Sequence, residues 1–164
     1  MVLGNVCWED NTLTHTAWTR PVELLLVEDN PADVHLLQEM LKEVKVPLHL
    51  SVVHDGAAAL AFLHRHEPYT QAVCPDLILL DLNLPGKSGL EVLHDVSQEP
   101  ALRQIPSIVL TGSHLAEDIR RSYALCANCY LVKPTTLAAF KQMIATLEDF
   151  WLRAATLPAH ADCH

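Results

Sequence analysis

Residues 75–81, Pro75-Asp76-Leu77-Ile78-Leu79-Leu80-Asp81, decide the fold of this 164-residue chain. The run is too short and too aliphatic for a surface helix, and it predicts a strand buried on both faces of a parallel sheet. The run ends in a carboxylate, and the chain then turns through residues 83–86, Asn-Leu-Pro-Gly. Open α/β sheets place their sites at the carboxyl ends of central strands. Asp81 is therefore the first candidate functional residue.

Three other apolar segments repeat this design of a short strand that runs into polar residues. They are residues 23–27 before Glu28 and Asp29, residues 106–110 before Thr111, and residues 130–132 before Lys133. Segments with helical periodicity lie between the strands, the first opened by Asn30 and Pro31 and the last striped from Leu137 to Trp151.

This strict alternation predicts an α/β fold: a flavodoxin-like, doubly wound, five-stranded parallel sheet with strand order 2-1-3-4-5 and five helices. In that order the first and third strands are neighbours, so Glu28, Asp29 and Asp81 converge. The fourth and fifth strands bring Thr111 and Lys133 to the same pocket.

Length and composition indicate one domain. We expect a flexible N-terminal extension over residues 1–20, the domain over 21–154 and a C-terminal tail over 155–164. The first twenty residues do not resemble a secretory signal, which predicts a cytoplasmic protein. A formal charge of −9 argues against nucleic-acid binding through phosphates, and no apolar run is long enough for a membrane span.

Three converging carboxylates repel one another. A like-charged pair about 4 Å apart costs about 4 kcal/mol at an effective dielectric of about 20, so a proton or a cation must offset the repulsion. Oxygen ligands suit Mg²⁺, which takes one or two protein carboxylates directly. With the Lys133 ammonium and the Thr111 hydroxyl alongside, the pocket suits a phosphoryl group, and Asp81 can attack phosphorus as the nucleophile.

Four segments together resemble the receiver domain of bacterial two-component response regulators, over about residues 22–152. They are Val27-Glu28-Asp29-Asn30, Leu80-Asp81-Leu82-Asn83-Leu84-Pro85-Gly86, Leu110-Thr111-Gly112 and Val132-Lys133-Pro134. The resemblance implies that Asp81 accepts a phosphoryl group from a histidine kinase, so the protein is a signalling phosphoprotein and not an enzyme acting on other molecules.

The same resemblance assigns roles to the other residues. It implies that Mg²⁺ is bound by Asp29, Asp81 and the backbone carbonyl of Asn83, with Glu28 contacting the ion through water. It implies that Thr111 and Lys133 bind the phosphoryl group and that the Lys133–Pro134 bond is cis. Tyr130 would turn inward after phosphorylation and so change the surface formed by the fourth helix, fifth strand and fifth helix.

Further segments resemble the single-domain regulators that partner phytochrome-type histidine kinases, namely Ser122-Tyr123, Ala127-Asn128-Cys129-Tyr130 and Glu148-Asp149-Phe150-Trp151-Leu152. That likeness implies a photoreceptor kinase as partner and homodimerisation through the last helix. From the length of the chain after the last helix we expect no DNA-binding output domain. The last helix carries more apolar residues than one core face needs, which also indicates a contact surface. Phe150 and Trp151 could instead fold back onto the domain.

Other functions remain as alternatives. A phosphatase of the haloacid dehalogenase type would need an acid where Asn83 stands, and an FMN-binding flavodoxin would not place Glu28 and Asp29 in its phosphate loop. A third alternative is a receiver-like docking module that works without phosphorylation. The Cys126-Ala127-Asn128-Cys129 motif lacks the basic neighbours of a redox pair and the further ligands of a zinc site.

Overall fold

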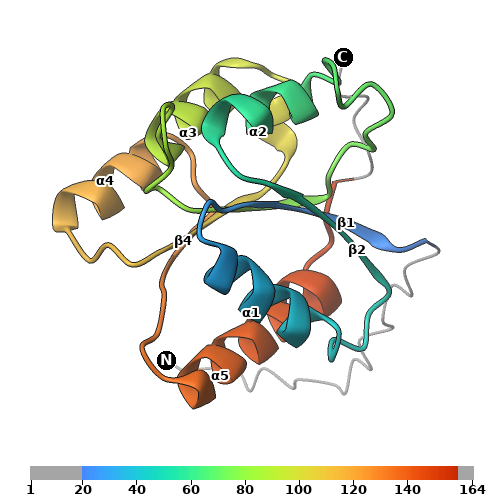
Figure 1. The fold of residues 1–164 in the computed structure, drawn as a ribbon, viewed down its shortest axis with the longest axis vertical. Helices are drawn as coiled ribbons and strands as arrows, with labels where there is room; N and C mark the ends of the chain where they lie inside the picture. The colour runs from blue at the N-terminus through green and yellow to red at the C-terminus, as the bar shows by residue number, and fades with distance from the viewer. Residues whose placement is uncertain (1–19, 159–164) are drawn as a thin grey trace, which may run out of the picture.

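A computed structural model describes residues 20–158. Its centre is a five-stranded sheet of order β2-β1-β3-β4-β5 in which every neighbouring pair is parallel, as the sequence predicts (Figure 1). The strands are β1 (Val22–Val27), β2 (Leu48–Val53), β3 (Leu77–Leu80), β4 (Ser107–Thr111) and β5 (Cys129–Val132). All four residues of β3 and all five of β4 are buried, because helices cover both faces of the sheet.

Five α-helices cover the sheet, with α1 and α5 on one face and α2, α3 and α4 on the other (Figure 1). They are α1 (Pro31–Leu41), α2 (Gly56–Leu63), α3 (Gly89–Gln98), α4 (Ala116–Ala124) and α5 (Leu137–Leu147). A 3₁₀ turn, η1 (Leu102–Gln104), precedes β4. The last helix does not stay α-helical to its end, because it continues beyond Leu147 as a π-helical segment, η2 (Glu148–Ala154).

Polar caps fix where the helices next to the pocket begin. The Asn30 side chain accepts a hydrogen bond from the Ala32 N–H at 2.9 Å, and Pro31 opens α1, as the sequence predicts. Ser88 and Glu91 form a reciprocal capping box at the start of α3. Gly86 has a φ of 67°, which the turn after Asp81 requires and which glycine adopts without strain. These local features set the loops that surround the ends of β1 and β3.

Two hydrophobic clusters lie on the two faces of the sheet. One joins alternate residues of β1, β3 and β4 to α2 and α3, and the other joins the intervening residues to α1 and α5. Helix α4 contributes no residue to either cluster within residues 20–158, and Ser122 is its one buried residue. The helix is therefore attached to the domain mainly through its polar contacts and its ends.

Both ends of the described chain contact the domain. The guanidinium of Arg20, the last residue of the expected N-terminal extension, makes two hydrogen bonds of 2.7 and 2.8 Å to the Asp76 carboxylate. In the expected tail, Leu157 is buried. Residues 1–19 of the expected extension and residues 159–164 of the expected tail lie outside the described part, so the domain limits stay a prediction. None of the helices in residues 20–158 has the length and apolar character to cross a membrane.

The expected cis bond before Pro134 is wrong. Among residues 20–158 the cis peptide bond is Glu67–Pro68, so Lys133–Pro134 is trans. The trans isomer is the intrinsically favoured one for a bond before proline. The Lys133 N–H still donates to the Thr111 carbonyl oxygen at 2.8 Å. That bond extends the pairing of β4 and β5 by one residue and directs the lysine toward the pocket.

Candidate functional site

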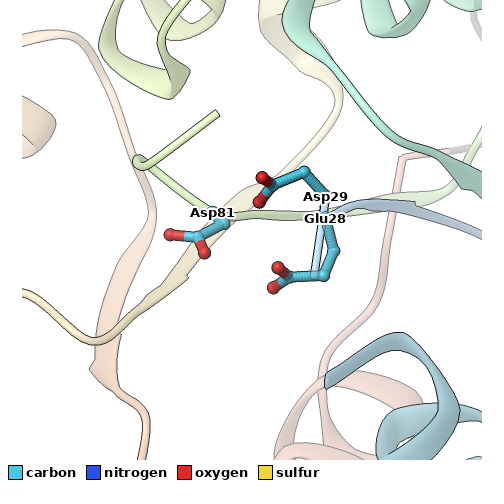
Figure 2. Close-up of side chains that lie close together, drawn as sticks. All are labelled: Glu28, Asp29 and Asp81. Atoms are coloured by element: carbon cyan, nitrogen blue, oxygen red, sulfur yellow. The ribbon is translucent and has the colours of Figure 1, made fainter. Parts of the chain in front are cut away.

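Three carboxylates meet at the carboxyl ends of β1 and β3, as the strand order predicts. Glu28 and Asp29 follow β1, and Asp81 follows β3. One ligand oxygen of each lies within 4.8 Å of the other two. Figure 2 shows that Glu28 and Asp29 leave the chain on opposite sides and that both turn toward Asp81. The Glu28 side chain is 1% exposed and that of Asp81 is 7% exposed, whereas Asp29 is open to solvent.

The Lys133 ammonium lies inside this acidic cluster. It donates to Glu28 at 2.6 Å, to Asp81 at 2.8 Å and to Asp33 at 2.8 Å. The structure thus confirms that Lys133 reaches the pocket, and it adds Asp33, from the first turn of α1, which the sequence did not single out. The signal in the sequence was weak, because an acidic residue in the first turn of a helix is ordinarily solvated and stabilises the helix through its interaction with the helix dipole.

Burial and charge have opposite effects on the two buried carboxylates. Burial raises the pKa of Glu28 above its ordinary value, and the hydrogen bond from Lys133 only partly offsets this rise. Burial also acts to raise the pKa of Asp81, but Lys133, the Asn83 N–H and Thr111 outweigh it and hold this pKa below its ordinary value. Asp81 is therefore an anion at neutral pH, as a nucleophilic carboxylate must be.

The pKa of Lys133 itself lies above its ordinary value. Burial opposes this shift, but the hydrogen bonds to Asp33, Asp81 and Glu28 exceed the effect of burial. The lysine is therefore an ammonium ion throughout the neutral range. One cation among Glu28, Asp29, Asp33 and Asp81 leaves the pocket with an excess of negative charge, which a divalent cation can neutralise.

Thr111 and Asn83 border Asp81 on its open side. The Asn83 N–H donates to Asp81 at 3.1 Å, and the Asn83 amide lies 3.5 Å from the Thr111 hydroxyl oxygen. Thr111 is fully buried, and its hydroxyl acts to lower the pKa of Asp81. A Cβ placed on Gly112 would meet no atom within 4 Å. The backbone beside Thr111 therefore borders open space at Gly112.

Ser113 joins this pocket to α4. Its N–H lies 3.4 Å from the Thr111 hydroxyl oxygen, and its own hydroxyl donates to Asp118, in the first turn of α4, at 2.6 Å. Its carbonyl oxygen accepts a hydrogen bond from the Tyr130 hydroxyl at 3.0 Å. The predicted switch residue Tyr130 therefore contacts the loop that begins at Thr111. The sequence analysis assigned no role to Ser113.

Gly89 lets the start of α3 pack against the backbone of Asp81 and Leu82. The first residue of α3 lies so close to the preceding strand that a Cβ there would stand 2.2 Å from the Asp81 carbonyl oxygen and 2.7 Å from the Leu82 Cα. Its N–H donates to the Leu82 carbonyl oxygen at 3.0 Å. The sequence analysis did not single out this glycine, because a contact between backbones leaves no periodic signal.

Cys126 and Cys129 lie on either side of the turn that leads into β5. Both are free thiols. Burial raises the pKa of the Cys129 thiol, which is the direction opposite to that of a reactive thiolate.

The carboxyl end of the chain carries an apolar groove. A cavity of about 470 Å³ lies between β5 and the last helix, bordered by residues such as Leu131, Met143, Phe150 and Trp151. Phe150 is 57% exposed. Trp151 is half-buried and packs against the core, with its ring 5.2 Å from that of Phe150 in an edge-on contact. The structure thus combines the two expectations, with Trp151 folded back and Phe150 exposed.

Comparison with known proteins places this geometry in a family. Residues 24–145 match the response regulator receiver domain. The chain belongs to that family. It is 48% identical over 139 residues to response regulator Rcp1 of Synechocystis sp., covering 85% of this chain and 95% of the relative.

Solved structures of the same receiver family agree with the fold. The Mn²⁺-bound form of Rcp1 has a TM-score of 0.81 and 47% identity, covering 85% of this chain and 100% of that one. The phosphorylated cyanobacterial phytochrome response regulator RcpA has a TM-score of 0.82 and 45% identity, covering 85% and 99%. These proteins carry a receiver of the same strand order.

Proposed function

We propose that this receiver is a single-domain response regulator that takes a phosphoryl group onto Asp81 from a histidine kinase. The observation that supports this most is the state of Asp81: a buried carboxylate with a lowered pKa, flanked by Lys133 and Thr111 and open beside Gly112. The phosphorylated relative RcpA supports the same role. A single domain is supported by Rcp1, of which this chain covers 95%.

The proposed reaction is an in-line displacement at phosphorus. An Asp81 oxygen forms a bond to phosphorus while the bond from phosphorus to the kinase imidazole nitrogen breaks, and the electron pair of that bond stays on the imidazole. The Lys133 ammonium and the Thr111 hydroxyl lie beside Asp81, and in this proposal they donate to the phosphoryl oxygens, where charge collects, once Lys133 has released one of its present partners. Hydrolysis of the acyl phosphate by water returns the Asp81 carboxylate. Beyond this self-modification we assign no catalytic activity.

Mg²⁺ fits the donor set as cofactor. Glu28, Asp29 and Asp81 offer only oxygen ligands, within 4.8 Å of one another, and Asn83 would add its backbone carbonyl. When bound, the ion would neutralise charge on the phosphoryl oxygens. The Mn²⁺ form of Rcp1 supports a divalent ion in such a receiver.

The proposed switch passes through the Thr111 loop. A phosphoryl oxygen that accepts the Thr111 hydroxyl proton draws this hydroxyl inward, and the loop follows because the Ser113 N–H donates to the same hydroxyl oxygen. Tyr130, bonded to the Ser113 carbonyl, follows the loop, and α4 follows through Asp118. The surface of α4, β5 and α5 then differs between the two states.

We further propose a phytochrome-type histidine kinase as the partner, in the cytoplasm, and a homodimer formed through the last helix. The kinase class is supported by the likeness to RcpA, a phytochrome response regulator.

The proposed dimer is supported by the exposed Phe150 ring beside the apolar groove between β5 and the last helix. Phe150→Ala tests the dimer by sedimentation, because it should shift the protein toward monomer. Exposed Leu115 offers a matched Leu115→Ala control outside the groove, and an unchanged Phe150→Ala dimer would reject this surface.

The central test is intact mass after incubation with Mg²⁺ and a small acyl phosphate donor. The parent should gain one phosphoryl group, and Asp81→Asn or added EDTA should abolish the gain. Asp76→Asn is no suitable control, because Asp76 holds Arg20, whereas exposed Asp149→Asn keeps the pocket intact. No gain in the parent, under conditions that modify another receiver, would favour the phosphate-independent docking module.

A further inference from the structure

The Lys133 ammonium has no hydrogen left for a phosphoryl oxygen. A lysine ammonium carries three N–H donors. Here they are directed to three carboxylates, those of Glu28, Asp33 and Asp81, at 2.6 to 2.8 Å. If Lys133 is to contact a phosphoryl group on Asp81, it must therefore release one of these partners.

Asp33 differs from the other two partners in position and exposure. The side chains of Glu28 and Asp81 are 1% and 7% exposed and belong to the cluster of three carboxylates. The side chain of Asp33 is 29% exposed and lies on α1. Water can solvate an Asp33 carboxylate that has lost its ammonium far better than it can solvate Glu28. Of the two partners that remain carboxylates once Asp81 is phosphorylated, Asp33 is thus the one that Lys133 can exchange at the smaller penalty.

We propose that Asp33 is a positioning residue that competes with the phosphoryl group for the ammonium of Lys133. The inference rests on the proposed function, because it concerns the phosphorylated state of Asp81. In the unphosphorylated protein Asp33 draws positive charge away from Glu28 and Asp81, which favours binding of a divalent cation. After phosphorylation the same contact withholds an N–H from the phosphoryl oxygens.

Two effects of opposite sign follow for Asp33→Asn. Without the Asp33 carboxylate, Lys133 binds Glu28 and Asp81 more firmly, so Mg²⁺ binds about fivefold more weakly. A phosphoryl mimic on Asp81 meets less competition and binds about fivefold more tightly, since one partly exposed charge-assisted hydrogen bond is at stake. A loosened or partly unfolded pocket would weaken both.

The experiment measures both affinities by titration calorimetry. Mg²⁺ is titrated alone, and beryllium trifluoride, a tetrahedral phosphoryl mimic, is titrated at saturating Mg²⁺. Glu39→Gln is the matched control, because it makes the same charge change on the same helix at an exposed site that pairs with Lys42. Asp33→Ser is the second variant, chosen to keep a polar residue in the first turn of α1. Unchanged or weaker binding of the mimic in both Asp33 variants overturns the proposal.

A lysine variant separates the proposed contact from the charge of Asp33 acting through space. Lys133→Gln keeps Glu28, Asp29 and Asp81, so Mg²⁺ binding remains measurable. In that background Asp33→Asn should change the Mg²⁺ affinity by less than about twofold, because the residue acts through Lys133. A fivefold loss that persists without Lys133 overturns the proposal. If the parent protein fails to bind beryllium trifluoride at all, the proposed function fails instead, so the two failures are distinguishable.

Discussion

The Tyr130 hydroxyl donates a hydrogen bond to the Ser113 carbonyl oxygen over 3.0 Å, so β5 holds the loop that leads from Thr111 into α4. This bond is the direct structural link between the predicted switch tyrosine and the pocket. Burial raises the pKa of Tyr130, so the phenol keeps its proton and remains a donor throughout the neutral range. The link therefore does not depend on pH near neutrality.

Replacing Tyr130 by Phe should remove this bond and little else. We expect a loss of about 0.5–1.5 kcal/mol in the free energy of unfolding, the usual net contribution of one hydrogen bond. Amide exchange in the loop over residues 112–116 should become faster, as hydrogen-exchange mass spectrometry would detect. Tyr123→Phe is the control, because Tyr123 is half exposed on α4. Equal exchange in both variants would show that the hydroxyl does not hold the loop.

The side chains of Ser113 and Asp118 should be energetically coupled. Ser113→Ala removes the donor, and Asp118→Ala the acceptor, of the 2.6 Å bond that fastens the first turn of α4. Because Leu115, the residue before α4, has no side-chain cap, this bond is a main polar restraint there. Each variant should lose about 1 kcal/mol, and the double variant should lose clearly less than the sum. Strictly additive losses in urea unfolding would show that the two groups act independently.

Magnesium should raise the melting temperature by relieving repulsion among the three carboxylates. At about 100 times its dissociation constant, a ligand that binds only the folded state adds about 2.7 kcal/mol. Asp29→Asn should remove most of this gain, since Asp29 is one of the three clustered ligands. Glu39→Gln should retain it. A melting temperature that does not respond to Mg²⁺ would contradict the assignment of the cluster as a cation site.

Two glycines near Asp81 should respond differently to a single methyl group. Gly89→Ala forces a Cβ against the Asp81 backbone, so we expect a loss of about 1–3 kcal/mol in stability and slower phosphorylation of Asp81. Gly112→Ala, where a Cβ meets nothing within 4 Å, should leave the free energy of unfolding within about 0.5 kcal/mol. Urea unfolding gives both stabilities. If Gly89→Ala were as stable as Gly112→Ala, the close approach of α3 to Asp81 would be wrong.

The sequence predicts the sheet and the pocket because their signals are local. A short aliphatic run that ends in an acid identifies β3 and Asp81, and strand order then places Glu28, Thr111 and Lys133 beside it. These predictions are confirmed. The strand order can be predicted from the sequence because parallel strands with helical crossovers have few allowed arrangements.

The features that sequence reasoning missed depend on contacts between distant segments. Asp33 matters because Lys133, 100 residues later, reaches it, and nothing in α1 alone indicates this. Gly89 matters because two backbones approach, which has no pattern in side chains. Sequence reasoning also missed the π-helical end of the last helix. The trans bond before Pro134 follows the general preference of the peptide bond.

Helix α4 lies outside both hydrophobic clusters, with Ser122 as its one buried residue. The part of the molecule that is proposed to report phosphorylation is therefore separate from the part that makes the chain fold. Substitutions on the outer face of α4 can alter which protein it recognises while leaving the packing of the sheet untouched. A family built on this plan can acquire new signalling partners by mutation without passing through unstable intermediates.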